Sequence, residues 1–272
     1  MTAPPALPVP PPPGLAAAVE AAWTRCRAAS GYLTEREARF LALLAAATPA
    51  RGVILEIGCF KGKSTVALAS IAARYGLGPV VAVDPHTTPS VTDPDLRGQT
   101  SSWADFQATL RAAEVEQAVE AHRAFSHDLA RGWARPIRLL WIDGDHTHAG
   151  AKQDLDLFRA HLVDGAVVAL HDVLHTFEGP IRVFVEELLR SDHFGPAGVC
   201  GSIGWAQFRP ADGRRWRQER EALAQRAGRL IPFVEEGRQP RGMRKVLYKL
   251  ARARVPHGVV KPEEWLATIT AQ

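Results

Sequence analysis

Cysteine is scarce in this chain of 272 residues, and its three cysteines, Cys26, Cys59 and Cys200, form no CxxC pair. An odd number of widely separated cysteines does not suit a small secreted domain held by disulfides, and it favours a reducing compartment. Long apolar runs are missing as well, because no stretch approaches the roughly 20 residues of a membrane-spanning helix. The N-terminus has neither a basic start nor an apolar core. We therefore expect no ordinary secretory signal and a cytoplasmic location.

Charge is low overall but unevenly placed. The formal net charge is +4, yet residues 209–261 hold 15 Lys and Arg against 5 Asp and Glu. The rest of the chain holds 18 basic residues against 24 acidic ones. A slightly acidic body with a basic extension differs from a uniformly basic nucleic-acid binder. No recognised nucleic-acid-binding module accompanies the charges, so we expect no specific nucleic-acid partner.

Composition divides the chain into three regions. Residues 1–13 form a Pro-rich leader that we expect to be disordered. Residues 14–210 form the predicted main domain, which opens with N-terminal helices. Thr34 and Glu37 make a capping box that predicts the start of one of these helices. Residues 211–272 form a basic, helical C-terminal extension.

Within the main domain, short apolar runs alternate with helical patterns. Strands are predicted at 53–58, 80–84, 119–124, 137–143 and 166–170, with a terminal hairpin within 199–208. Continuously apolar strands that alternate with helices indicate a parallel sheet covered on both faces. The predicted fold is therefore α/β, a doubly wound Rossmann-like sheet of seven strands. Five of these are parallel and two form the C-terminal hairpin, and ligands should bind at the carboxyl ends of the strands.

The loop after the first predicted strand reads EIGCFKGKS over residues 56–64. Its GxxxG spacing differs from the GxGxxG of dinucleotide-binding folds. It is also one residue short of a Walker A loop, although residues 139–143 imitate the strand that would hold magnesium. A third interpretation uses the polar positions. Glu56 before the loop and Asp84 at the end of the second strand suit a ligand with an ammonium group, a sulfonium and a ribose.

Four segments together resemble a known family. ILEIGCFKGKST, VVAVDPH, LLWIDGDHTHAGAKQDLDLF and DGAVVALHDV are similar to the class I S-adenosylmethionine-dependent methyltransferases. The most similar branch is the bacterial methyltransferase family 24 type, which is related to macrolide sugar O-methyltransferases, cephalosporin hydroxylase and catechol O-methyltransferase. The resemblance runs from about residue 31 to residue 208. The four motifs in this order support the resemblance more strongly than the glycine loop does alone.

The resemblance implies a methyl-donor site. Ser126 would flank the adenine and Asp143 the methionyl side of S-adenosylmethionine. The residues that would hold the rest of the donor are Glu56, Gly58, Phe60, Gly62, Ser64 and Asp84.

Acidic residues and histidines follow the fourth and fifth predicted strands. Asp143, His171 and Asp172 are candidate ligands for Mg²⁺ or Mn²⁺, which would lower the pKa of an acceptor hydroxyl. Relatives with a metal usually carry two adjacent acids, or Asp-Asn, after the fifth strand, and this chain has His171 beside Asp172. The competing interpretation needs no metal. In it His146 or His171 takes the proton, so that Asp143, His146 and His171 are the candidate catalytic residues.

The C-terminal extension contains a basic amphipathic pattern. Its apolar members are Met243, Val246, Leu247, Leu250 and Val255. Two interpretations remain open: a helix packed on the domain with a solvated basic face, or peripheral contact with an anionic membrane surface.

The combined prediction is an S-adenosylmethionine-dependent methyltransferase that methylates a hydroxyl on a small molecule, sugar or glycolipid. Whether a divalent metal assists the reaction is left open by the sequence. A P-loop-like phosphotransferase and a non-catalytic S-adenosylmethionine-binding module are the alternatives. The sequence is also compatible with a homo-oligomer.

Overall fold

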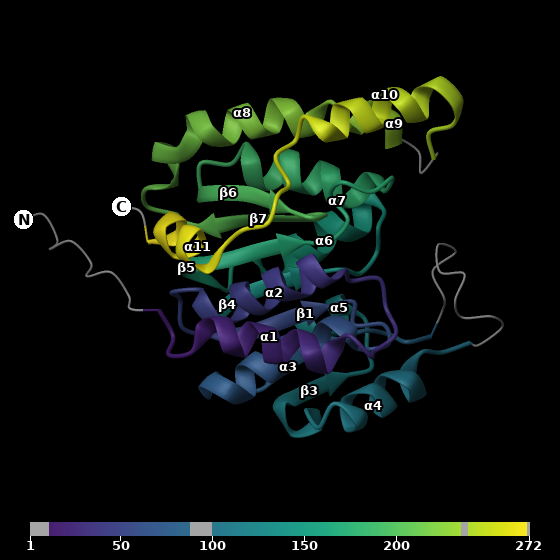
Figure 1. The fold of residues 1–272 in the computed structure, drawn as a ribbon, viewed down its shortest axis with the longest axis vertical. Coiled ribbons are helices and arrows are strands. Elements are labelled where there is room, and N and C mark those ends of the chain that lie inside the picture. The colour runs from purple at the N-terminus through teal and green to yellow at the C-terminus, as the bar shows by residue number, and fades with distance from the viewer. Residues whose placement is uncertain (1–10, 88–99, 235–238, 271–272) are drawn as a thin grey trace, which may run out of the picture.

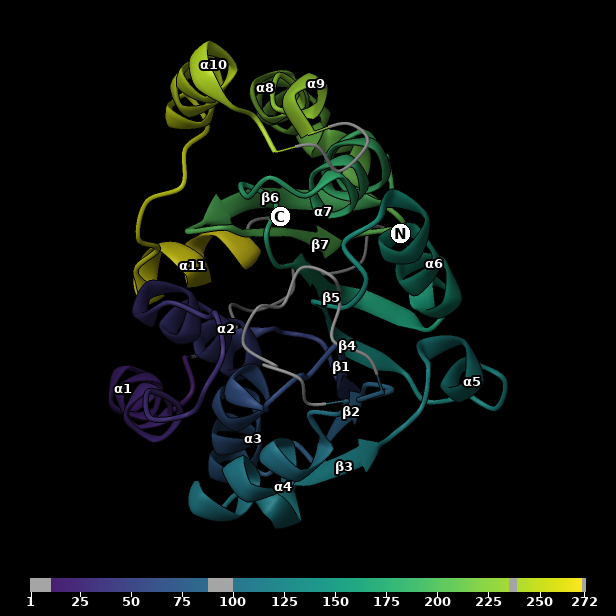
Figure 2. The same cartoon turned by 90° about the vertical axis from the view of Figure 1, so that its right-hand side faces the viewer.

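A computed structural model describes residues 11–87, 100–234 and 239–270. Its centre is a seven-stranded sheet in the order β3-β2-β1-β4-β5-β7-β6 (Figures 1 and 2). The strands are β1 (Val53–Ile57), β2 (Val80–Val83), β3 (Val119–His122), β4 (Ile137–Ile142), β5 (Leu162–Leu170), β6 (Phe194–Cys200) and β7 (Ile203–Phe208). β1 to β5 pair in parallel, while β7 pairs antiparallel with both β5 and β6. The predicted fold class is confirmed.

Helices cover both faces of the sheet. In Figure 2, α1 (Leu15–Cys26), α2 (Glu35–Ala47), α3 (Lys63–Tyr75) and α11 (Pro262–Ile269) lie on the left, while α5 (Ser126–Ala130) and α6 (His148–Arg159) lie on the right. The remaining helices are α4 (Trp103–Ala112), α7 (Glu178–Val183), a π-helical segment (Phe184–Leu189), α8 (Arg217–Gly228), α9 (Ile231–Val234) and α10 (Gly242–Ala253); short 3₁₀ turns span Glu116–Ala118 and Gly213–Trp216. Side chains of alternate strand residues enter two separate cores, one under each helical layer. Apolar residues on both faces explain why these strands lack a polar alternation.

The β5 strand is longer than its predicted range of 166–170. It begins at Leu162, and its register against β4 shifts between the pairs Ile137–Leu162 and Leu139–Val167. Gly165 adopts a φ of 80° within this shift. The Asp164-Gly165 pair is therefore part of an irregular strand, where the sequence indicated a turn before the strand.

The C-terminal helices pack on the body of the molecule. Trp265 of α11 is fully buried and meets the rings of Phe40 and Trp205 at centroid distances of 5.7 and 4.6 Å. Arg220 of α8 is 1 % exposed, and its guanidinium donates to backbone carbonyls that include those of Leu189 and Ser191. Residues beyond 210 thus complete both cores. The boundary at residue 210 and the disorder of residues 1–13 stay predictions, and residues 1–10 lie outside the described part of the chain.

Candidate active site

The carboxyl ends of β1 and β4 form the switch point of the sheet, where the strand order reverses. The Asp143 amide donates to the Ile57 carbonyl at 2.8 Å, and the His171 amide donates to the Ile142 carbonyl at 3.0 Å. These bonds extend the ladder one residue past each strand. They bring the polar residues that follow β1, β4 and β5 to the same edge, which is where doubly wound sheets bind ligands.

Backbone strain marks the same edge. Phe60, His86 and Asp172 are non-glycine residues with positive φ values of 44°, 51° and 61°. They follow β1, β2 and β5 respectively. Strained conformations of this kind cluster at ligand-binding and catalytic sites, because only a fixed function or packing maintains them.

The glycine loop passes very close to the end of β4. Gly58 has a φ of 83°, and a Cβ at this position would lie 2.2 Å from the Asp143 carbonyl oxygen. No other residue fits there. Gly62, with a φ of 90°, is the residue that caps the N-terminus of α3, and it lies against Phe106. The loop backbone is therefore held between two strand ends and the first turn of a helix.

Glu56 is fully buried beneath this loop. One carboxylate oxygen accepts from the Ser64 hydroxyl, and the other, Oε2, has no hydrogen-bond partner. Burial raises the pKa of Glu56 to about 8; the Ser64 hydrogen bond opposes this shift, and the negative charges of Asp143 and Asp84 add to it. A buried, unpartnered carboxylate oxygen is costly unless a positively charged or donor group completes it.

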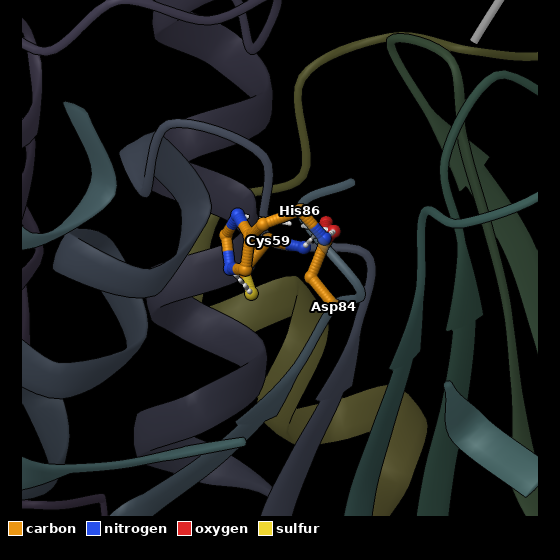
Figure 3. A group of neighbouring side chains, drawn as sticks. All are labelled: Cys59, Asp84 and His86. Carbon is orange, nitrogen blue, oxygen red and sulfur yellow. Dashed lines mark hydrogen bonds and ion pairs between the residues drawn. The ribbon is translucent and has the colours of Figure 1, made fainter. Parts of the chain in front are cut away.

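Asp84 is bonded to the backbone around it. Its carboxylate accepts from the amides of Cys59 (3.0 Å) and His86 (2.7 Å), which Figure 3 shows, and from the amide of Phe60 (2.9 Å). These bonds tie the end of β2 to the glycine loop. The Nδ1 atom of His86 lies 2.8 Å from the Ser102 hydroxyl, which fixes the imidazole.

Cys59, Asp84 and His86 also bring one potential metal-ligand atom each within 4.8 Å of one another. The donor set does not fit a metal, however. Burial raises the pKa of the Cys59 thiol well above its usual value, so the sulfur keeps its proton. Burial lowers the pKa of His86 against the opposing charge of Asp84, which favours the neutral imidazole and does not itself oppose a metal. Since Asp84 already accepts three amide bonds, we interpret this cluster as support for the loop.

The loop contacts argue against a phosphate-binding P-loop. The Lys63 ammonium donates to the Gly31 carbonyl at 3.3 Å, and the Ser64 hydroxyl donates to Glu56. In a P-loop the lysine would contact phosphate and the serine would bind magnesium. Here both side chains bond to other groups of the protein instead. The carboxylates of Asp84 and Asp143 beside the loop would repel a triphosphate.

A second acidic cluster joins the ends of β4 and β5. The Nε2 atom of His146 lies 3.6 Å from Asp143 Oδ1 and 3.5 Å from Asp172 Oδ2, and it is buried without a hydrogen bond. Its ring stacks on Phe177 at a centroid distance of 4.3 Å. Burial lowers the pKa of His146, but the nearby carboxylates of Asp143 and Asp172 raise it by more. Asp143, His146 and Asp172 form a group in which a metal ion could be held.

His171 lies behind this group. Its Nδ1 atom is 3.2 Å from Asp143 Oδ1 and 3.3 Å from Asp172 Oδ1, and its Nε2 atom faces Glu37 at 3.7 Å. Burial opposes protonation, but Asp143 and the other two acids raise the pKa of His171 well above its usual value. Three carboxylates thus surround the buried imidazole and favour its charged form.

Glu37 is a site residue that the sequence did not reveal. It was expected only in the capping box, which is present with Thr34. In the structure it also accepts from the Ser202 amide and hydroxyl, both at 2.6 Å. Burial raises the pKa of Glu37, but His171, Ser202 and Thr34 outweigh burial and hold it far below its usual range. The only sequence signal was an acid at the start of a mostly apolar helix.

Ser126 and Phe60 occupy the rim of the site. The Ser126 hydroxyl donates to Asp154 Oδ1 at 2.5 Å, and burial raises the pKa of Asp154 to about 6, against the opposing Ser126 bond. Asp154 is a second residue that the sequence analysis missed, although it stands out as an acid on the apolar face of α6. The Phe60 ring stacks on Tyr32 at a centroid distance of 6.2 Å.

The predicted site residues thus lie along one edge of the sheet. The donor candidates surround the glycine loop, and Asp143 links them to His146, His171 and Asp172. Their individual roles stay predictions. The part of the predicted acceptor region at residues 88–99 lies outside the described residues.

Comparisons with known proteins agree with this fold. Residues 55–173 match the family described as a methyltransferase domain. A putative O-methyltransferase from Klebsiella pneumoniae is similar in structure, with 19% identity, a TM-score of 0.52, and coverage of 75% of this chain and 92% of that chain. A methyltransferase from Geobacter sulfurreducens has 19% identity and a TM-score of 0.50, covering 75% and 91%. Cofactor-bound Rv0187 from MTB has 22% identity and a TM-score of 0.50, covering 73% and 91%.

At these identities the structural matches show the fold alone, and the domain match shows the activity class of the segment that it covers. Residues 55–173 form a methyltransferase domain on the fold of the class I S-adenosylmethionine-dependent methyltransferases.

Proposed function

We propose that this enzyme methylates an oxygen atom, on a hydroxyl of a small molecule, sugar or glycolipid. The observation that carries the proposal is the convergence of Asp143, His146 and Asp172 beside the glycine loop. A hydroxyl is a weak nucleophile until its proton is removed or its pKa is lowered. A neutral amine or a thiolate needs no such help. A cluster of two carboxylates and an imidazole at the donor site is what an oxygen acceptor requires.

The residues around the glycine loop fit the methyl donor. S-adenosylmethionine supplies an electrophilic methyl group on a positively charged sulfur when it is bound. Glu56, with its unpartnered Oε2, would complete the positively charged amino-acid end. Asp84 would accept from ribose hydroxyls, and it holds the amides of the loop. Positioning of donor and acceptor would then supply much of the rate enhancement.

The second part of the proposal is a divalent metal held by Asp143, His146 and Asp172. The orphaned Nε2 atom of His146 between two carboxylates supports this set. A metal there would lower the pKa of the acceptor hydroxyl. His171 would act differently, because its ring lies behind the group, between Glu37 and the two aspartates; it would orient Asp143 and Asp172. One nitrogen and two oxygen ligands tolerate Mn²⁺ or Fe²⁺ as well as Mg²⁺.

Calorimetry on the full chain tests the metal. Mn²⁺ should bind, and Asp172→Ala should abolish binding, whereas Asp156→Ala on the exposed face of α6 should not. In a transfer assay over hydroxyl acceptors, a chelator should suppress turnover and leave donor binding intact. Full turnover in excess chelator would defeat the metal proposal, and His146→Ala would then be tested as a base. Transfer to nitrogen acceptors alone would defeat the oxygen assignment.

A further inference from the structure

Helix α10 presents an apolar stripe to solvent. Met243, Val246, Leu247 and Leu250 are 71%, 50%, 48% and 55% exposed. Their spacing of three, four and seven residues places them on one side of the helix. Four large apolar side chains on one exposed helix face form a patch of the kind that marks an interaction surface.

A different side of α10 holds the helix to the body. Tyr248 is 5% exposed, and its hydroxyl lies 2.8 Å from the carbonyl oxygens of Leu174 and His175 in the loop after β5. Its ring meets Phe233 at a centroid distance of 6.0 Å, and Ala251 is buried on the same side. Because these contacts fix the orientation of α10, the apolar stripe cannot turn toward the core without breaking them.

Basic side chains accompany the stripe. Residues 241–254 contain six Lys and Arg and no acidic residue. Arg244 lies over the Phe233 ring and donates to the Pro232 carbonyl. Within the described part of the chain, none of the six forms an ion pair. The helix therefore combines an outward apolar face with unneutralised positive charge.

We propose that α10 binds the surface of a bilayer that contains anionic lipids, with the helix in the plane of the interface. Met243, Val246, Leu247 and Leu250 would enter the boundary between headgroups and acyl chains, and the basic residues would contact the lipid phosphates. No helix among the described residues is long and apolar enough to cross a membrane, so this contact is peripheral.

A second copy of the chain is the competing occupant. Pairing two copies through this stripe would bring six positive charges near six others with no acid on either helix. A zwitterionic or neutral apolar partner would leave the same charges without complement. An anionic bilayer satisfies the apolar and the charged side chains together.

Flotation of the full-length protein with vesicles tests the proposal. Vesicles of phosphatidylglycerol and phosphatidylcholine in equal amounts should bind the chain about tenfold better than phosphatidylcholine alone, and raised salt should reduce binding. Leu247→Ser with Leu250→Ser should weaken binding about tenfold, as should Lys245→Glu with Lys249→Glu. Arg27→Glu with Arg111→Glu makes the same charge change at exposed positions just after α1 and in α4, and it should leave binding unchanged.

These variants alter exposed side chains only, so their melting temperatures should match that of the parent chain. Failure of the parent chain to bind anionic vesicles would overturn the proposal. So would equal binding by the Leu247→Ser, Leu250→Ser variant. Light scattering is the remaining measurement. A dimer that this variant dissociates, without vesicle binding by the parent, would assign the stripe to a second copy instead.

Discussion

The substitution Glu56→Gln tests the role of the carboxylate charge beneath the glycine loop. The substitution keeps an oxygen that can accept from Ser64 and removes the group whose pKa burial raises to about 8. In the parent chain without donor, Glu56 therefore carries a proton at pH 7. A positively charged donor favours the ionised carboxylate, so donor binding should release that proton.

The release of this proton on donor binding sets the direction and the size of the pH dependence of donor affinity. Below pH 8 the affinity of the parent chain for S-adenosylmethionine should rise by at most about tenfold per pH unit, and it should level off above pH 8. The amino group of the donor also titrates near this range. The informative quantity is therefore the ratio of the parent and variant affinities at each pH. That ratio should increase from pH 6 to pH 8.

The same shift affects stability without donor. The pKa of Glu56 is raised above its unfolded value of 4.5, so its stabilising contribution is complete below pH 4.5 and is lost as the pH rises through 8. A difference of about 3.5 units sets an upper limit of about 5 kcal/mol on the loss. The Glu56→Gln variant has no such loss, and its unfolding free energy should vary less with pH.

Calorimetry in buffers of different ionisation enthalpy measures the released proton directly. The parent chain should release close to one proton at pH 6.5–7, and Glu56→Gln should release none. Glu116→Gln, an exposed position in a 3₁₀ turn, is the matched control and should behave as the parent. Identical proton release in the parent and Glu56→Gln would refute the assignment of Glu56 to the positively charged end of the donor.

Three further predictions concern neighbouring contacts. Asp84→Ala should weaken donor binding by about 1–3 kcal/mol in calorimetry, because three amides of the site lose their acceptor along with the ribose contact; unchanged affinity would place the ribose elsewhere. Glu37→Gln should lower the unfolding free energy by about 1–3 kcal/mol at pH 7. Since the folded pKa of Glu37 is lowered, that cost should shrink as the pH falls below about 4.5, and a constant cost would show that its charge is not involved. Trp265→Ala should destabilise the protein by about 3–5 kcal/mol in chemical unfolding, and a small effect would mean that α11 is dispensable for the core.

The sheet could be predicted because β2, β4 and the second half of β5 are mostly apolar and are followed by a polar residue, whereas β3 contains Glu120 and His122 and gives a weaker signal. Residues 137–142 are buried throughout, and the polar Asp143 follows at once. Such a pattern requires helices on both faces, and the handedness of the crossovers then fixes the edge to which the polar ends point. The bulge in β5 could not be predicted in this way, because Asp164-Gly165 is compatible with either a turn or an irregular strand.

Prediction was less complete in the C-terminal extension. The helical spacing of Met243, Val246, Leu247 and Leu250 was evident, but a helical period does not say which face is buried. Tyr248 and Ala251 are the buried residues of α10, and the stripe faces outward. Tyr248 faces the body of the protein because its hydroxyl bonds to backbone carbonyls there. The apolar side chains of the stripe remain exposed in the described structure.

The polar network behind the site was beyond sequence reasoning for a different reason. Glu37 and Ser202 are 165 residues apart, yet they share two hydrogen bonds beside His171. Neither residue follows a parallel strand, so the rule that locates Asp84 and Asp143 does not apply to them. Their contact arises because α2 packs against the sheet next to the β6–β7 turn. Strand ends define where chemistry occurs in this fold, while the packing of helices on the sheet decides which charges support it.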